Sequence, residues 1–160
     1  MSDRIPMTRV GYDKLKGDLA LKEQVEMPEI LERIAKARSE GDLSENAEFD
    51  GAIEAQGMLQ REINVIRDKL SRAVLIDPTK VPKGEVAFGA TVVVKDLDLG
   101  DEEEFTLVGA GEEDYMAGKI LVTSPLAQGL LGKKVGEQVE IEVPAGITRF
   151  EILAIRSGDE

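Results

Sequence analysis

Two long helical patterns joined by a very short connection constrain this fold more than any other feature of the sequence. After Thr8, apolar residues recur at helical spacing as far as Ala37, and a second pattern runs from about Ser44 to Ala73. The second pattern has a heptad spacing of apolar residues, which favours a coiled-coil seam. Two helices joined by so few residues must run antiparallel, so the sequence predicts a long helical hairpin. The expected seam of the second helix consists of Ala52, Leu59, Ile63, Ile66, Leu70 and Ala73.

The first arm of this hairpin has recognisable ends and one irregularity. Thr8 is a suitable N-cap, and Gly41 can terminate the helix in a left-handed conformation. Arg38 lies in the last turn, where the helix dipole favours a cation. Pro28 lies inside the arm and removes one helical hydrogen bond, so we expect a kink or a short break there. The residues expected to face the second arm are Leu15, Leu19, Met27, Ile30, Leu31, Ile34 and Ala37.

Acidic residues gather where the chain turns between the two arms. No Lys or Arg occurs from Ser39 to Gln60, whereas six carboxylates do. With roughly 30 residues per arm at 1.5 Å each, the hairpin would be about 45 Å long, so its tip would lie far from the rest of the molecule. The six acidic residues are Glu40, Asp42, Glu45, Glu48, Asp50 and Glu54.

Asp42 and Glu45 have two alternative roles. Three residues apart at a helix start, they can form a capping-box arrangement and interact favourably with the helix dipole. Alternatively, both carboxylates project from the tip and help to hold a divalent cation. Mg²⁺ prefers octahedral oxygen ligation, which two carboxylates do not complete, so this role requires a partner that supplies further ligands. Leu43 and Phe49 can likewise pack on each other or contact a partner surface.

Composition narrows the chemistry of any site. The 160 residues include neither Cys nor His, which excludes disulfides, thiolate zinc sites and acid–base catalysis by histidine. Carboxylates remain, and they suit hard cations such as Mg²⁺. The formal net charge of −12 argues against a free-standing nucleic-acid binder, which needs a basic surface. With neither a signal sequence nor an apolar run of about 20 residues, we expect a cytoplasmic protein without a membrane segment.

The pattern changes after Asp77. Two prolines and a glycine within eight residues indicate a linker at 78–84. Beyond it, short β patterns and one short helix predict a small α+β domain with a mainly antiparallel sheet. The helix is expected to have Ser124 as N-cap, Pro125 as its first residue and Gly132 just after its end. The expected strands are residues 90–94, 104–108, 119–123, 138–143 and 149–155.

Two segments of this second half invite a functional interpretation. The loop at Ser124 and Pro125 is expected to be exposed enough to dock a partner, while Leu130 and Leu131 pack on the sheet. The acidic segment from Asp96 to Glu104 resembles a calcium loop in charge only, because it lacks the spacing of an EF-hand. We therefore expect that segment to form a solvated hairpin loop.

Several motifs together resemble one known family. Their order and chemistry are similar to those of the bacterial Gre transcript-cleavage factors, and the GreA type in particular, over essentially the whole chain. The tip motif is the most specific of them. The motifs are Ile5–Thr8, Pro28–Ile30, Ala37–Arg38 followed by Gly41–Phe49, Phe88–Val92, Ser124–Ala127 and Gly129–Lys133.

The resemblance implies a two-domain protein that acts on RNA polymerase. An antiparallel coiled coil, residues 1–77, would enter the secondary channel of the polymerase. A linker, residues 78–84, would join it to an FKBP-like domain, residues 85–160, that docks at the channel rim. Asp42 and Glu45 would help the polymerase to hold a second Mg²⁺ and the attacking water, so that the polymerase hydrolyses a backtracked transcript.

The same resemblance implies which contacts the chain would make. It would meet the 3′ end of the nascent RNA only through the polymerase, bind no cofactor tightly, act as a monomer and be no enzyme itself. The Mg²⁺ would be shared with the active site of the polymerase. The residues expected to contact the partner are Arg38, Ser124, Pro125 and Leu126.

The sequence departs from the family at Ile53, where members often carry a basic residue that lies near the RNA 3′ end. We therefore expect weaker contact with the RNA and slower cleavage. Three alternatives stay open: a channel-occupying regulator without cleavage activity, a structural coiled-coil adaptor, and a peptidyl-prolyl isomerase suggested by the FKBP-like domain. The last needs an aromatic pocket, for which the second half offers Phe88, Phe105, Tyr115 and Phe150.

Overall fold

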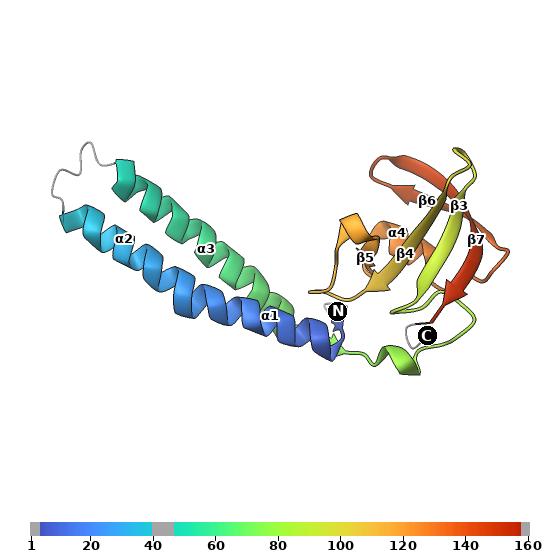
Figure 1. Cartoon of the computed structure of the whole chain (residues 1–160), viewed down its shortest axis with the longest axis horizontal. Coiled ribbons are helices and arrows are strands. Elements are labelled where there is room, and N and C mark those ends of the chain that lie inside the picture. Colours follow the sequence, from blue (N-terminus) through green and yellow to red (C-terminus); the bar gives the residue numbers. More distant parts are fainter. Residues whose placement is uncertain (1–3, 40–46, 158–160) are drawn as a thin grey trace. The chain divides into compact units, whose positions relative to one another are not determined.

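The chain forms two compact bodies, which we describe separately. The computed structural model describes residues 4–39 and 47–157 (Figure 1). One body is helical and comprises Asp13–Arg72. The other combines residues 73–157 with residues 4–12. This two-part architecture of a helical hairpin and a small α+β domain confirms the predicted fold class.

The first arm of the hairpin follows an unbroken helical path. It comprises α1 (Arg9–Leu21), a π-helical turn (Lys22–Glu26) and α2 (Met27–Ser39). The residues that flank the π-helical turn, Leu21 and Met27, both keep right-handed helical backbone angles. The second arm is the single helix α3 (Ala47–Ser71), which runs alongside the first arm (Figure 1). The helical hairpin is therefore present as predicted.

Thr8 begins the first arm as its N-cap. The backbone N–H of Gly11 donates to Thr8 Oγ1 over 3.1 Å, which satisfies one of the free donors of the first turn. Thr8 Oγ1 in turn donates to Glu112 Oε1 over 2.5 Å. The predicted cap is confirmed, and the same hydroxyl also ties the start of α1 to a loop far along the chain.

The irregularity expected near Pro28 takes the form of the π-helical turn rather than of a break. The backbone N–H of Met27 donates to Lys22 O, five residues earlier. Pro28 has no N–H, and its ring would crowd the carbonyl of Gln24 in a regular α-helix. A wider turn just before the proline relieves that crowding while the remaining donors keep their partners.

The seam between the arms is largely as predicted. The second arm buries Ala52, Leu59 and Ile63, and the first arm buries Leu15, Ile34 and Ala37. The prediction for Leu31 is wrong, because 47% of its surface is exposed. It follows Ile30 directly, and one residue corresponds to about 100° around a helix, so only one of these two neighbours can face α3.

The second arm ends earlier than predicted and is followed by an unpredicted strand. α3 stops at Ser71, and β2 (Ala73–Leu75) pairs in parallel with β1 (Ile5–Met7). Met7 is fully buried there. Gly109 is required beside it, since a Cβ at that position would lie 2.7 Å from Pro6 O. Each strand has only three residues and pairs across almost half of the chain, so local patterns do not reveal it.

This pairing changes how the chain divides. Residues 1–77 were expected to form the helical domain and 78–84 a linker. In the structure residues 4–12 group with the second body, as do residues 73–157. The expected linker contains a 3₁₀ turn (Pro78–Lys80) that Asp77 caps by accepting from the N–H of Thr79 over 2.9 Å. Ile76 and Val81 pack against the core of the second body.

The second body is built on a five-stranded sheet. Its order is β5-β4-β3-β7-β6, with only β4 and β5 parallel, so the predicted mainly antiparallel sheet is confirmed (Figure 1). The core is apolar, and its fully buried side chains include Val92, Val94, Leu107, Leu130 and Ile152. The strands are β3 (Thr91–Asp96), β4 (Glu102–Val108), β5 (Lys119–Leu121), β6 (Gln138–Val143) and β7 (Gly146–Arg156).

One short helix, α4 (Pro125–Leu130), packs against β6. Ser124 is its N-cap and accepts from the N–H of Ala127 over 3.2 Å, as predicted. Gly132 follows the helix with φ of 82°, the left-handed conformation expected of it. At Gly129 a Cβ would lie 2.7–2.9 Å from three carbon atoms of Ile141, so the absence of a side chain lets α4 approach β6.

We expect Gly129→Ala to destabilise the second body, because the added methyl group overlaps the buried Ile141 side chain. The free energy of unfolding should fall by about 1–3 kcal/mol. Gly17→Ala in α1 is the matched control: nothing lies within 4 Å of its added Cβ. That variant should gain up to about 1 kcal/mol from helix propensity. Differential scanning calorimetry of the full chain measures both, and equal shifts for the two variants would contradict the close approach of α4.

Candidate functional site: the base of the hairpin tip and the docking segment

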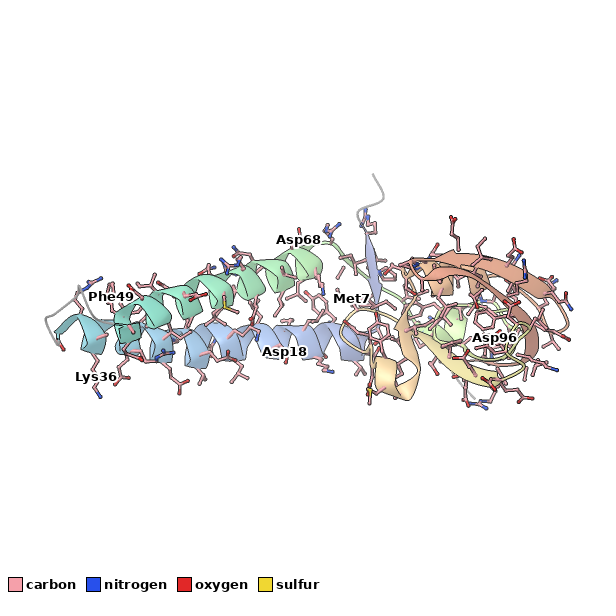
Figure 2. The ribbon with its side chains drawn as sticks, turned by 90° about the horizontal axis from the view of Figure 1, so that it is seen from above. Met7, Asp18, Lys36, Phe49, Asp68 and Asp96 are labelled. Carbon is pink, nitrogen blue, oxygen red and sulfur yellow. The ribbon has the colours of Figure 1, made fainter. Side chains whose placement is uncertain are left out.

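The tip carboxylates singled out by the sequence, Asp42 and Glu45, lie outside the described residues, as do Glu40 and Leu43. Their metal-assisting role therefore stays a prediction. The structure describes the two helix ends that lead to the tip, namely the last turns of α2 and the first turns of α3. Figure 2 shows Phe49 and Lys36 at this end of the hairpin, with Asp18 and Asp68 toward its other end.

Two side-chain contacts join the arms at the base of the tip. The guanidinium of Arg38 lies over the ring of Phe49, with its Cζ 5.7 Å from the ring centroid. Arg33 Nε donates to Glu48 Oε1 over 3.1 Å. Both contacts join α2 to α3. Phe49 is therefore in contact with the other arm of the hairpin, through the side chain of Arg38. The expected contact of Arg38 with the partner stays a prediction, but the structure gives this residue a role inside the chain as well.

Small side chains bring the arms close together just behind these contacts. Ala37 is 1% exposed and Ala52 is fully buried. A larger side chain at either position would have to be accommodated in a closely packed seam. The helix ends that carry the tip are thus held by a tight apolar contact, a cation–π contact and an ion pair.

The described acidic residues do not form a metal site by themselves. Within residues 4–39 and 47–157, no group of three or more carboxylates converges where a metal ion could bind. Glu48 is engaged by Arg33, and Asp50 and Glu54 are exposed on α3. Carboxylates are the right donors for Mg²⁺, but a complete ligand set would have to include groups from outside these residues.

Ile53 lies on α3 one helical turn beyond Phe49 and is 41% exposed. It therefore presents an apolar surface one turn above the base of the tip. The structure leaves this position open to a ligand that approaches the base of the tip. The predicted weakening of RNA contact is not tested by the structure.

The predicted docking segment has one exposed residue and two that support the fold. Pro125 is exposed, whereas Ser124 is half-buried as the cap of α4. Leu126 is partly buried and packs against the core. It also lines a hollow of about 410 Å³ together with Phe105 and Phe150. A partner that docks here would therefore meet Pro125 first and an apolar hollow beside it.

The four aromatic residues considered for an isomerase pocket do not converge. Phe105 and Phe150 contact each other edge to face, with centroids 6.2 Å apart. Phe88 is buried in the core, while Tyr115 is 62% exposed. Only two of the four rings line the hollow, so the structure offers little support for an aromatic proline pocket.

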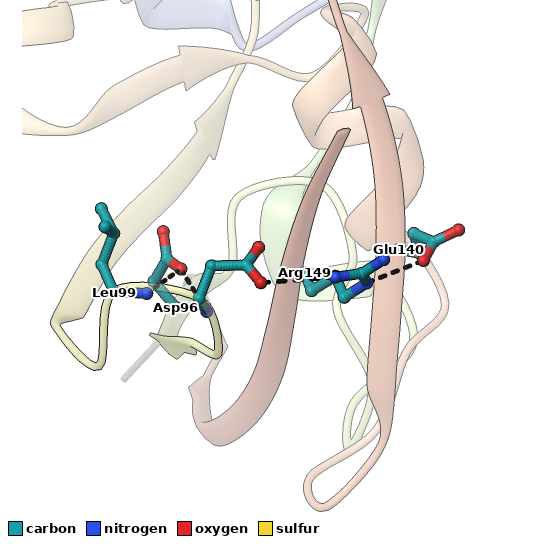
Figure 3. Close-up of polar contacts among 5 residues, drawn as sticks. Asp96, Leu99, Glu140 and Arg149 are labelled. Atoms are coloured by element: carbon teal, nitrogen blue, oxygen red, sulfur yellow. Dashed lines mark hydrogen bonds and ion pairs between the residues drawn. The ribbon is translucent and has the colours of Figure 1, made fainter. Parts of the chain in front are cut away.

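The acidic loop between β3 and β4 is a hairpin loop, as predicted. Asp96 accepts from the backbone N–H groups of Asp98 and Leu99 over 2.8 and 2.9 Å (Figure 3). Arg149 links this loop to β6, since it pairs with Asp98 at 3.3 Å and with Glu140 at 2.9 Å. The hydrogen bond that Arg149 donates to Glu140, followed by the charges of both carboxylates, raises the pKa of Arg149. These carboxylates are used within the fold.

Comparison with known proteins assigns the family. The chain matches the family models for the N-terminal region of transcription elongation factors, over residues 5–75, and for the GreA/GreB C-terminal region, over residues 81–157. It is 50% identical to the transcription elongation factor GreA of Thermodesulfovibrio yellowstonii, over 97% of this chain and 98% of that protein. It is 43% identical to the GreA of Chelativorans sp., over 98% and 99% of the two chains.

The chain therefore belongs to the GreA/GreB family of transcription elongation factors. Among solved structures it is similar to GreA factor homolog 1 (Gfh1) of Thermus thermophilus, with 24% identity, coverage of 96% and 99%, and a TM-score of 0.45. No helix in the described parts of the chain is both long and apolar enough to cross a bilayer.

A double-mutant cycle should detect the contact at the base of the tip. Arg38→Ala and Phe49→Ala remove the same cation–π contact, so their effects on the free energy of unfolding should be coupled by about 0.5–1 kcal/mol. Lys36→Ala with Phe49→Ala is the control, because Lys36 is an exposed cation of the same helical turn, whereas Arg38 is the cation that lies over that ring. Calorimetry of the full chain measures each variant. Equal coupling in the two cycles would contradict a specific role for Arg38.

Proposed function

We propose that this chain is a transcription elongation factor that inserts its helical hairpin into the secondary channel of RNA polymerase. There it stimulates the polymerase's own hydrolysis of backtracked nascent RNA and so releases arrested complexes. Family membership supports the proposal, together with relatives of nearly the same length that are named transcription elongation factor GreA. The observation that carries it is the acidic sequence around Asp42 and Glu45, which connects α2 with α3 in the chain.

The dimensions of the hairpin suit a device that carries side chains to a recessed place. α3 alone has 25 residues. At 1.5 Å per residue this corresponds to roughly 38 Å, long enough to enter a deep channel. The contacts of Arg38 with Phe49 and of Arg33 with Glu48 keep the arms together up to the base of the tip. Paired helices that stay together to their ends would deliver the tip as a unit.

The chemistry assigned to the tip is assistance rather than independent catalysis. Mg²⁺ held at the active site of the polymerase supplies the charge that stabilises the attacking and leaving oxygens of the hydrolysis. In the proposal, the carboxylates of Asp42 and Glu45 complete the ligand shell and accept hydrogen bonds from the attacking water. Two carboxylates are too few to hold the ion alone, so the chain is proposed to be an activator and not itself the nuclease.

The second body is proposed to dock at the rim of the channel. Pro125 is exposed at the start of α4, and Leu126, Phe105 and Phe150 line an apolar hollow beside it. The chain would act as a monomer and would meet the RNA 3′ end only within the polymerase. Arg38, the cation nearest to the acidic tip in the sequence, is the candidate for a contact there. An acidic tip repels bare phosphate, so binding to free RNA is not expected.

The Asp42→Asn/Glu45→Gln double variant should lose stimulation of cleavage while keeping its affinity for polymerase. These substitutions preserve side-chain size and remove the charge that the metal and the water need. The cleavage rate at saturating factor should fall by about 100-fold or more, the scale for removing a group that stabilises a transition state. The measurement is transcript cleavage in a backtracked elongation complex with Mg²⁺.

Glu54→Gln is the matched control for that experiment, because it removes an exposed carboxylate from α3 outside the tip pair. With this variant the polymerase should cleave the transcript at the rate that it reaches with the native chain. If the native chain binds polymerase yet leaves the RNA intact, the channel-occupying regulator replaces the cleavage factor. If the polymerase cleaves as fast with the double variant as with the native chain, the tip pair has no role in the chemistry.

Ile53→Lys should increase cleavage by restoring a cation near the RNA 3′ end. One added charge-assisted hydrogen bond of about 1 kcal/mol corresponds to roughly a fivefold gain. The gain should shrink as salt is raised, because mobile ions screen the charge. Ile53→Met keeps the length without the charge and serves as control. No gain with Lys in the same cleavage assay would count against the predicted weakness of RNA contact.

A further inference from the structure

One flank of α3 carries apolar residues that the hairpin seam does not use. Met58 is 50% exposed and Val65 is 53% exposed. They are seven residues apart, which is two helical turns and about 10 Å, so they lie on the same side of the helix. They line a hollow of about 450 Å³ within the helical body. Its other lining residues are Lys22, Arg61, Glu62 and Ile66.

The hairpin does not need this flank for its own packing. Leu59 and Ile63 already fill the seam, at 4% and 2% exposure. Leaving half of a methionine and half of a valine in water forgoes stabilisation, since each apolar side chain gains about 1.5–3 kcal/mol on full burial. Apolar groups that gather around a hollow, rather than lie scattered, are typical of a surface that another molecule covers.

The charges around the hollow are not balanced. Lys22 Nζ pairs with Glu62 Oε1 at 3.2 Å, and this hydrogen bond is the main cause that raises the pKa of Lys22. These two charges therefore cancel each other. Arg61 has no carboxylate partner in the part of the chain that the structure describes. The hollow thus offers two apolar side chains and one cation without a counter-charge.

We propose that the Met58 flank, formed by Met58, Arg61 and Val65, is the face by which the hairpin docks on RNA polymerase. The matching surface of the polymerase presents an aliphatic side chain next to a carboxylate. The aliphatic side chain packs between Met58 and Val65, and the carboxylate pairs with Arg61. This inference rests on the proposed function, because that function carries the hairpin into the polymerase. It adds which face of the hairpin meets the wall of the channel.

A second copy of this chain fits the flank less well. In an antiparallel arrangement of two α3 helices, Met58 would lie against Val65 of the other copy and Arg61 against its Glu62. That Glu62 is already engaged by Lys22 in each copy. The two cations would have to share one carboxylate, whereas a polymerase carboxylate would pair with Arg61 alone.

The flank and the tip have separable effects in this proposal. Docking through the flank sets how tightly the factor is held, while Asp42 and Glu45 act on the chemistry once it is bound. Variants of the flank should therefore raise the concentration needed for half-maximal effect and leave the effect at saturation unchanged. Tip variants should lower the effect at saturation and leave the concentration needed for half-maximal effect unchanged.

The test compares Met58→Ser/Val65→Ser with the native chain in binding to the core RNA polymerase, followed by the fluorescence anisotropy of a dye-labelled chain. The dissociation constant should rise about tenfold, the scale expected for losing apolar anchors at the centre of an interface. Leu31→Ser is the matched control, because Leu31 is 47% exposed and lines none of the hollow. It should bind like the native chain.

Arg61→Glu provides a second variant that does not depend on apolar packing of the hairpin. Reversal of this charge should weaken binding more at low salt than at high salt. An unchanged dissociation constant for both flank variants would overturn the proposal. So would sedimentation that shows a dimer of the native chain which Met58→Ser/Val65→Ser dissociates, since a second copy would then occupy the flank.

The binding assay also separates this inference from the proposed function. If the native chain binds polymerase without stimulating cleavage, the proposed chemistry fails, and the difference between flank and control variants still decides the inference. If the native chain cleaves normally and the flank variants bind equally well, only the inference fails. A native chain that does not bind polymerase overturns both.

Discussion

The pairing of β1 with β2 is the contact on which the hairpin depends. It brings Ile5 beside Ala73 and Met7 beside Leu75, the residues that precede the first arm and follow the second. The N–H of Ile76 extends the pairing by donating to Met7 O over 2.8 Å. Two arms whose open ends are joined by main-chain hydrogen bonds cannot slide past each other. A register error of one residue in this strand pairing would shift one arm against the other by about 3.3 Å, which is a large error for side chains that are proposed to reach a reacting phosphate.

In the proposed mechanism, this chain supplies a stable hairpin with carboxylates at its tip, and RNA polymerase supplies the metal ion. Arg38 and Phe49 stabilise the end of the hairpin, and the carboxylates beyond them offer ligands that are useful only where a metal is already held. In the proposed mechanism, such a division would prevent hydrolysis of RNA in free solution. It would also allow a protein with neither His nor Cys to assist phosphoryl chemistry, because the metal ion belongs to its partner.

Local patterns predicted most of the fold because the signals involved are local. The caps at Thr8 and Ser124 and the alternation of strands such as β6 depend on neighbouring residues, and all are confirmed. The pairing of β1 with β2 joins residues far apart in sequence, which no local spacing encodes. At the site, residue type and the family resemblance suggested a role for Asp42 and Glu45 that stays a prediction, whereas the contact of Arg38 with Phe49 required three-dimensional structure.

The π-helical turn explains the irregular middle of the first arm's apolar pattern. An unbroken α-helix that buries Leu15 and Leu19 would next bury residues near 22, 26 and 29. The buried or half-buried apolar residues instead resume at Met27, Ile30 and Ile34, one position later. The wide turn takes up one additional residue, so the stripe continues in phase with α3 on both sides of it. The arm therefore behaves as a straight rod that has absorbed a one-residue insertion, and the proline that follows marks where the insertion is accommodated.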